Sequence, residues 1–276
     1  MLHILLPTDF SDQSWKAMSF ASQLYHNQAV QFHLLHVVPV PITQSEVGVI
    51  PDMTDFIADA EMALVKLQGR FEDLEHHDSA LFTSHVQLGS LADLIHKLEE
   101  EFPAKTMIVM GTRGASGLAE FFLGSTTTHL ISHAVSPMVV VPEAAELKPI
   151  QHVILAVDDE GIQHKREILP LIEVLKQRDS RLKIIHVQTD NEAVLEAGST
   201  TQLRLDQYLA GIDHAYDTLE GAYHEDALNQ YAIKDNASLI ALLKRDRGFW
   251  GNLFHRSLTK NMAFYGDIPL LILRGE

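Results

Sequence analysis

The feature that most constrains this chain is a short apolar run that ends in a glycine-rich loop. Residues 107–110, MIVM, are followed directly by residues 111–125, GTRGASGLAEFFLGS. A short apolar run bounded by glycine is typical of a strand buried on both faces, as in a parallel sheet. Apolar or small residues at positions 130, 131, 134 and 135 then predict a helix that packs against this sheet. The segment therefore predicts a strand, a loop and a helix.

The loop between this strand and this helix is typical of an anion site. Ser125 is a good N-cap residue, and Gly124 before it allows a ligand to approach the backbone closely. The first N–H groups of a helix lack intrahelical partners and, with the helix dipole, favour phosphate. Two other phosphate motifs are absent, namely GxxxxGK followed by Ser or Thr, and GxGxxG after the first strand. An ordinary glycine-rich connection is the alternative interpretation.

Composition excludes several classes of protein. The formal net charge of −16 argues against a nucleic-acid partner, and the absence of cysteine excludes disulfides, thiol catalysis and thiolate metal sites. No stretch approaches 18 apolar residues, and MLHILLPTDF at the N-terminus lacks the basic region and cleavage site of a signal peptide. We therefore expect a cytoplasmic protein with no membrane partner. The length of 276 residues suits two domains.

Strands and helices alternate along the first half of the chain. Strands are predicted at 2–7, 30–38, 80–88, 106–110 and 138–141, with helices at about 12–27, 55–76 and 91–102 and after the glycine loop. This alternation predicts a parallel sheet that is covered on both faces. The second of these helices has its predicted core face at Ile57, Met62, Ala63, Leu67 and Phe71.

The second half of the chain repeats the first. Residues 152–157 followed by Asp158 match residues 3–8 followed by Asp9, and residues 182–187 match residues 32–37. Pro269 and the apolar run 270–273 lie 132 positions after Pro137 and the run 138–141. A duplication predicts one domain at 1–143, a polar linker at 144–150 and a second domain at 151–276. The second copy has a shorter helix, near 199–211.

These features together resemble a known family. Gly111, Gly114, Gly124 and Ser125 stand in the pattern G-x2-G-x9-G-S, which resembles the ATP-binding branch of the universal stress protein family. Because the duplication covers nearly the whole chain, it is similar to a tandem member of that family. The resemblance implies an α/β fold of two tandem Rossmann-like (adenine nucleotide alpha hydrolase-like) domains. Each is expected to be an open, mostly parallel five-stranded sheet with helices on both faces.

The resemblance also implies which residues of the first domain hold a nucleotide. Asp9 matches the strand-end acidic residue near the adenosine, and Val37 matches the residue whose backbone meets the adenine. The floor beside the ribose is matched by Met110 and Gly111, and the phosphate cradle by Gly114, Gly124, Ser125 and Thr126. Open α/β sheets bind ligands at the carboxyl ends of their strands, where all these residues belong. From the residues alone, the alternative interpretation of Asp9 is a helix-capping aspartate, and Val37 is simply a core strand residue.

The expected ligand is ATP, with Mg2+ held through the phosphate oxygens and no metal site made by the protein alone. The leading hypothesis is a stress-response protein in which bound ATP sets conformation or partner choice. No general base or arginine finger is recognised in the loop, so any hydrolysis is expected to be slow. The alternatives are a true ATPase or nucleotidyl-transferring enzyme, and an interaction module whose second domain binds another small or apolar ligand.

The loop of the second domain lacks the motif. Counted 132 positions on, the three glycines are replaced by Leu243, Asp246 and Arg256, whereas Ser257 keeps the place of Ser125. Without these glycines the backbone cannot approach phosphate closely, and Asp246 repels it. We therefore expect only the first domain to bind ATP. The alternative is that the Arg256 guanidinium, which suits phosphate, restores a site by another route. The predicted filling of the second site is Arg256 reaching Asp246 or Asp158 beneath Phe249 and Trp250, and residues 245–247, RDR, are interpreted as a loop of mixed charge.

The last strand of each half is an apolar edge-strand candidate, at 139–141 and 270–273. The resemblance implies that such strands mediate dimers between family members, and a tandem chain can satisfy this pairing within itself. We expect an intrachain pseudo-dimer about a pseudo-two-fold axis, and a homodimer of whole chains stays open.

Overall fold

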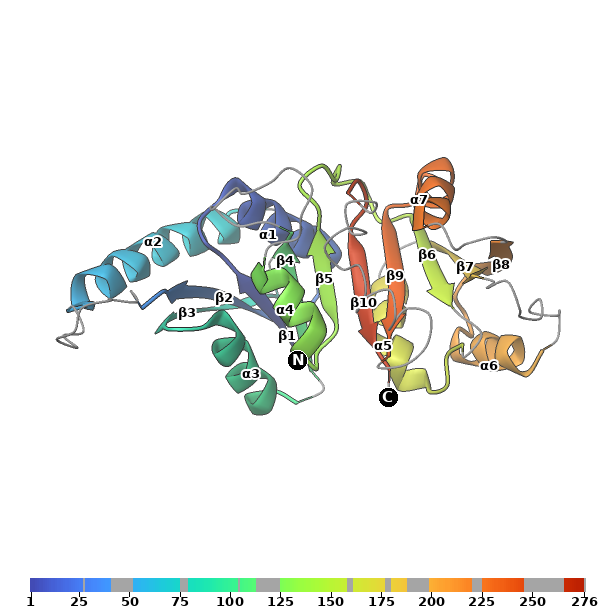
Figure 1. The fold of residues 1–276 in the computed structure, drawn as a ribbon, viewed down its shortest axis with the longest axis horizontal. Coiled ribbons are helices and arrows are strands. Elements are labelled where there is room, and N and C mark those ends of the chain that lie inside the picture. Colours follow the sequence, from blue (N-terminus) through green and yellow to red (C-terminus); the bar gives the residue numbers. More distant parts are fainter. Residues whose placement is uncertain are drawn as a thin grey trace. The chain divides into compact units, whose positions relative to one another are not determined.

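The computed structural model describes residues 1–26, 28–40, 52–74, 79–103, 105–112, 125–157, 161–176, 180–187, 199–219, 225–245 and 266–275. These residues contain ten strands and seven helices, which fall into two compact units (Figure 1). The first unit contains β1 (Leu2–Pro7), α1 (Asp12–Leu24), β2 (Val30–Val38), α2 (Thr54–Glu72), β3 (Leu81–Leu88), α3 (Leu91–Glu101), β4 (Thr106–Gly111) and α4 (Ser125–His133). The second contains β5 (Met138–Val141), β6 (His152–Val157), α5 (Lys165–Lys176), β7 (Arg181–Val187), α6 (Thr200–Tyr208), β8 (His214–Leu219), α7 (Glu225–Lys234), β9 (Leu239–Lys244) and β10 (Leu270–Arg274).

The strands of the first unit form a parallel sheet in the order β3-β2-β1-β4. Pro7 of β1 pairs with Leu35 of β2, and Leu5 of β1 pairs with Ile108 of β4. The chain adds β2 and β3 on one side of β1 and then places β4 on the other side. The strand order therefore reverses between β1 and β4, and the carboxyl edge at such a reversal is where open α/β sheets bind ligands.

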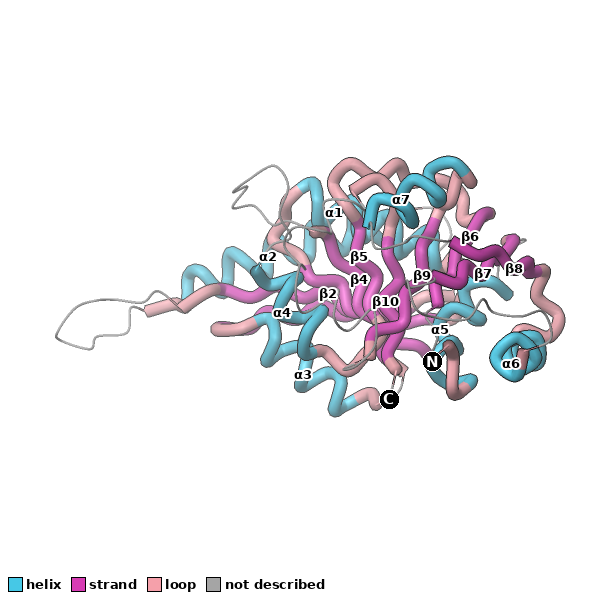
Figure 2. Tube along the Cα trace, turned by 45° about the vertical axis from the view of Figure 1, so that its right-hand side comes forward, coloured by secondary structure: helices cyan, strands magenta, loops and turns pink. Residues whose placement is uncertain are grey.

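Helices cover both faces of this sheet. Successive residues of a strand point to opposite faces, and Phe32 and His33 of β2 contact aromatic rings from different segments. The ring of Phe32 lies 5.1 Å from Phe71 of α2, whereas the ring of His33 lies 5.4 Å from Phe102, which follows α3. Figure 2 shows α1 and α2 on one side of the strands and α3 and α4 on the other. The predicted α/β architecture is confirmed.

The core face of α2 differs from the prediction. Its buried residues are Ala60, Leu64 and Phe71, whereas Met62 is 58% exposed. The prediction for Met62 was wrong because apolar residues are spread around this helix, including exposed Phe56 and Val65, so periodicity alone selects no single face.

The second unit has the same central order, with two strands, β10 and β5, added next to β9. Its sheet runs β5-β10-β9-β6-β7-β8, and the strand order reverses between β6 and β9. The strands from β10 to β8 are parallel, but β5 pairs antiparallel with β10 through Leu271 and Val139. The expected pairing of these two apolar strands is therefore present. Through it β5 belongs to the second unit, whereas the sequence repeat assigns β5 to the first domain; the domain limits and the pseudo-two-fold axis stay predictions.

Three histidines form a hydrogen-bonded row across the first sheet. His33 on β2 bonds to His3 on β1 at 2.9 Å (His3 Nδ1 to His33 Nε2) and to His85 on β3 at 3.0 Å (His33 Nδ1 to His85 Nε2). Each neutral ring can donate one hydrogen bond and accept one, so an uncharged row satisfies both bonds. Burial, helped by the two neighbouring histidines, lowers the pKa of His33 from 6.5 to about 4. Burial also lowers the pKa values of His3 and His85.

This row predicts a loss of stability in acid. Because its folded-state pKa values lie below those of the unfolded chain, the unfolded chain takes up more protons below pH 6.5. The stabilisation is complete above that pH and is lost as the pH falls towards about 4. In a His33→Gln variant the amide keeps one donor and one acceptor but does not titrate. We expect its melting temperature to fall less between about pH 7 and about pH 5 than that of the wild type.

The matched control is His96→Gln, because His96 lies exposed on α3, where it forms an ion pair with the exposed Glu100. This control should keep the wild-type dependence of melting temperature on pH. Equal pH dependence in the wild type and the His33→Gln protein would contradict the assignment.

Candidate functional site

The carboxyl edge between β1 and β4 carries a carboxylate at the start of a helix. Ser11 is the N-cap of α1, and its Oγ accepts a hydrogen bond from the Ser14 N–H at 3.2 Å. Asp9 Oδ1 in turn accepts from the Ser11 N–H at 3.1 Å and from Ser11 Oγ at 2.5 Å. Asp9 thus stabilises the turn into α1 through Ser11, which is itself the N-cap. It also places an acceptor group at the edge where the strand order reverses.

Gly111 ends β4 beside a side chain that the sequence did not single out. A Cβ atom at Gly111 would lie 2.7 Å from Gln13 Cγ and 2.9 Å from Gln13 Nε2. Thr127 of α4, which is 2% exposed, donates from Oγ1 to the Gly111 carbonyl at 3.2 Å. Gly111 is therefore enclosed by Gln13 of α1 and Thr127 of α4. No periodicity marks Gln13, and Thr127 lies within a run of three threonines, so neither was predicted.

The structure brings part of the predicted site together. Asp9 follows β1, while Met110, 7% exposed, and Gly111 end the neighbouring β4. Val37 lies half-buried near the end of β2, and Thr126 is exposed in the first turn of α4. Ser125 is the first residue of α4. Gly114 and Gly124 lie outside the described residues.

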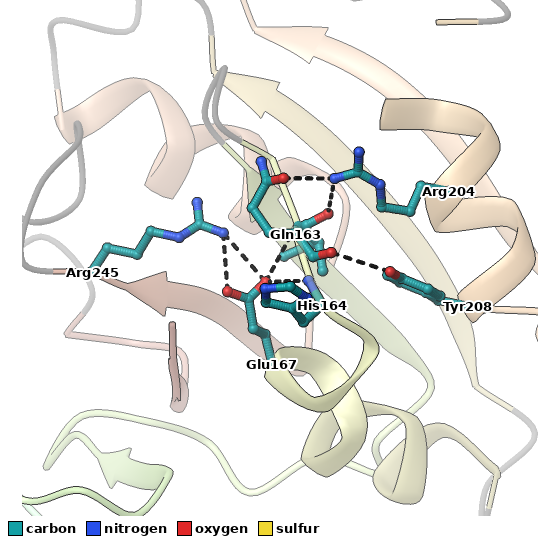
Figure 3. Close-up of polar contacts among 7 residues, drawn as sticks. Gln163, His164, Glu167, Arg204, Tyr208 and Arg245 are labelled. Carbon is teal, nitrogen blue, oxygen red and sulfur yellow. Dashed lines mark hydrogen bonds and ion pairs between the residues drawn. The ribbon is translucent and has the colours of Figure 1, made fainter. Parts of the chain in front are cut away.

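The same edge of the second sheet is occupied by an ion pair. Arg245 directly follows β9, and its Nη2 lies 3.3 Å from each carboxylate oxygen of Glu167 on α5 (Figure 3). Arg245 is 7% exposed and Glu167 is 3% exposed. Glu167 Oε2 also accepts hydrogen bonds from the backbone N–H groups of Gln163 at 2.7 Å and His164 at 3.0 Å. One buried carboxylate therefore caps α5 and neutralises the arginine.

Helix α6 fixes the turn that leads into α5. Arg204 donates from Nη1 to Gln163 Oε1 at 2.7 Å and to the Ile162 carbonyl at 3.3 Å, and the Tyr208 hydroxyl donates to the Gln163 carbonyl at 3.2 Å (Figure 3). Arg245 follows β9, as the interpretation of a loop requires, but its guanidinium is buried against Glu167. Residues 246–247 lie outside the described residues. The predicted contacts of Arg256 with Asp246 or Asp158, beneath Phe249 and Trp250, fall outside the described residues.

The sequence profile of the universal stress protein family matches residues 1–142, which carry the β1–β4 edge. The chain belongs to the universal stress protein family. Universal stress protein G of Salmonella typhimurium is 31% identical over 144 residues, which is 50% of this chain and 96% of that protein. Universal stress protein YxiE of Bacillus subtilis is 31% identical over 146 residues, 50% of this chain and 94% of that protein.

A solved universal stress protein from Archaeoglobus fulgidus matches both halves of the chain. The comparison gives a TM-score of 0.71 at 20% identity and covers 99% of this chain and 96% of that chain. At 20% identity the match shows that the two proteins share a fold, and it carries no conclusion about a shared ligand. Among the described helices, none combines the length and the hydropathy that crossing a membrane requires.

Proposed function

We propose that this universal stress protein binds ATP at the carboxyl edge of β1 and β4, within a first domain spanning residues 1–143. The observation that carries the proposal is the convergence of Asp9, Met110 and Gly111 at the reversal of strand order. Asp9 supplies an acceptor for the ribose hydroxyls, and the backbone of Val37 meets the adenine. The phosphate cradle is formed by Gly114, Gly124, Ser125 and Thr126.

The described residues fit a nucleotide in chemical terms. The hydrogen bond from Thr127 to the Gly111 carbonyl connects the end of β4 with the first turn of α4. The N-terminal N–H groups of this helix favour an anion. The formal charge of −16 makes long-range attraction of a triphosphate unfavourable, so local N–H groups and Mg2+ on the phosphate oxygens must neutralise it.

We further propose that this is the single nucleotide site of the chain, because the two edges differ in what a ligand must displace. At the first edge the neighbour of Gly111 is the neutral, flexible Gln13. At the second edge Arg245 and Glu167 form a buried ion pair, and leaving one charge of such a pair without the other costs about 3–5 kcal/mol. Residues 151–276 then form a second domain of the same family without a nucleotide.

The proposed role is that of a stress-response regulator in which bound ATP sets conformation or partner choice. At the β1–β4 edge the Asp9 carboxylate accepts hydrogen bonds from the N–H and the hydroxyl of Ser11 at the start of α1. This arrangement favours nucleotide retention with slow hydrolysis over a true ATPase or nucleotidyl transferase.

The test is to denature freshly purified protein by heat and to analyse the released nucleotide. We expect ATP to be recovered. Recovery of ADP or AMP alone would favour an enzyme, and recovery of no nucleotide, together with no binding of added ATP, would contradict the proposal.

A further inference from the structure

A phenylalanine in a strained backbone conformation lies at the same edge. Phe10, between Asp9 and the N-cap of α1, has a φ angle of 64°. This left-handed region is uncommon for residues other than glycine and is a clear outlier for a bulky side chain. Such strain persists where the surroundings determine the conformation, and it gathers at ligand sites.

Several hydrogen bonds determine the conformation of Phe10. Its N–H donates to Thr8 Oγ1 at 3.0 Å, and Thr8 Oγ1 lies 2.9 Å from Ser14 Oγ on α1. The Thr8 carbonyl is bonded to His36 Nδ1 of β2 at 2.8 Å. Phe10 is thereby tied to α1 on one side and to β2 on the other.

The side chain of Phe10 nevertheless stays open to ligands. Its ring packs against the ring of His36, with 4.4 Å between centroids, yet the residue remains 39% exposed. Because Pro7 pairs with Leu35, the residues that follow β1 run beside His36 and Val37. Val37 is the proposed neighbour of the adenine. An exposed aromatic ring therefore lies at the base end of the proposed site, backed by a second ring.

We propose that Phe10 contacts the nucleobase, its ring packing against the flat face of the purine, and that its strained backbone is retained to hold the ring there. This inference rests on the proposed ATP site. Stacking of a base on an aromatic side chain changes affinity by roughly 5- to 150-fold. The contact involves the base alone, so it should not affect the binding of phosphate.

The test compares Phe10→Ala, Phe10→Gly and Phe10→Tyr by titration with ATP and with inorganic tripolyphosphate. We expect Phe10→Ala and Phe10→Gly to weaken ATP binding by roughly 5- to 150-fold, with tripolyphosphate affinity unchanged and ATP affinity restored in Phe10→Tyr. Because glycine relieves the left-handed strain that alanine keeps, Phe10→Gly should melt about 2–4 °C above Phe10→Ala. Phe56→Ala is the matched control, since Phe56 on α2 is 60% exposed; it should bind ATP like the wild type.

Three results would overturn this inference. The first is wild-type ATP affinity in both the Ala and the Gly variants. The second is an equal loss of ATP and tripolyphosphate binding, which would indicate a change in the shape of the loop rather than a lost base contact. A wild-type protein that binds neither ligand would overturn the proposed function and this inference with it.

Discussion

Gly114→Asp is expected to abolish ATP binding in a protein that remains folded. The substitution adds a side chain where the phosphates must approach the backbone and a negative charge beside them. Two unit charges 4 Å apart interact by about 4 kcal/mol at an effective dielectric constant of 20. Repulsion from even one phosphate charge at that distance lowers affinity by more than about 100-fold. Titration calorimetry with ATP measures the loss, and circular dichroism establishes that the variant is folded.

Gly69→Asp is the control for this experiment. Gly69 lies on α2 in the same unit, and a Cβ atom there would meet nothing within 4 Å. It introduces the same side chain and charge into open space, so ATP affinity should match that of the wild type. Retained ATP affinity in folded Gly114→Asp protein would refute the assignment of the loop as the phosphate cradle.

The largest effect on stability is expected from the ion pair of the second unit. Glu167→Gln removes the negative charge that lies 3.3 Å from the buried Arg245 guanidinium. Breaking a buried pair in this way costs about 3–5 kcal/mol, although the glutamine oxygen still accepts from the backbone N–H groups that begin α5. Urea denaturation should therefore show a transition of the variant at a clearly lower denaturant concentration than that of the wild type.

Two further variants separate this effect from a general loss of charge. Glu173→Gln removes an exposed carboxylate from the same helix and should change stability by no more than about 0.5 kcal/mol. Adding Arg245→Met to Glu167→Gln also removes the buried positive charge and should restore most of the loss. If Glu167→Gln alone is no less stable than Glu173→Gln, the Arg245–Glu167 pair does not stabilise the second unit.

The architecture was predictable because it depends on local patterns. Short apolar runs such as 107–110 and 152–157 recur at fixed spacing and become β4 and β6, with helices between the strands. The pairing of β5 with β10 was predictable for the same reason, since both are short, wholly apolar runs that end their halves of the chain. The exposed Met62 on α2 marks the limit of this reasoning, because a helix with apolar residues on several sides has no unique core face in its sequence.

The contents of the two edges were less predictable because they depend on contacts between distant residues. The positions of Asp9 and Gly111 at the carboxyl ends of β1 and β4 were predictable, because both lie at the end of a short apolar run. The contact of Gln13 with Gly111, however, requires the register of α1 against β4, which no spacing in the sequence reveals. Arg245 and Glu167 are likewise separated by 78 positions, so the charged run at 245–247 gave no sign that its first member is buried.

The measurement that tests the central claim most directly is the stoichiometry of ATP binding to protein stripped of its own ligand. Titration calorimetry of the full chain in the presence of Mg2+ should give one ATP per chain, bound by the first domain. The Gly114→Asp chain measured in the same way should give none. Two equivalent sites per chain would contradict the proposal that only the first domain binds nucleotide. No binding to the wild-type chain would contradict the nucleotide site itself.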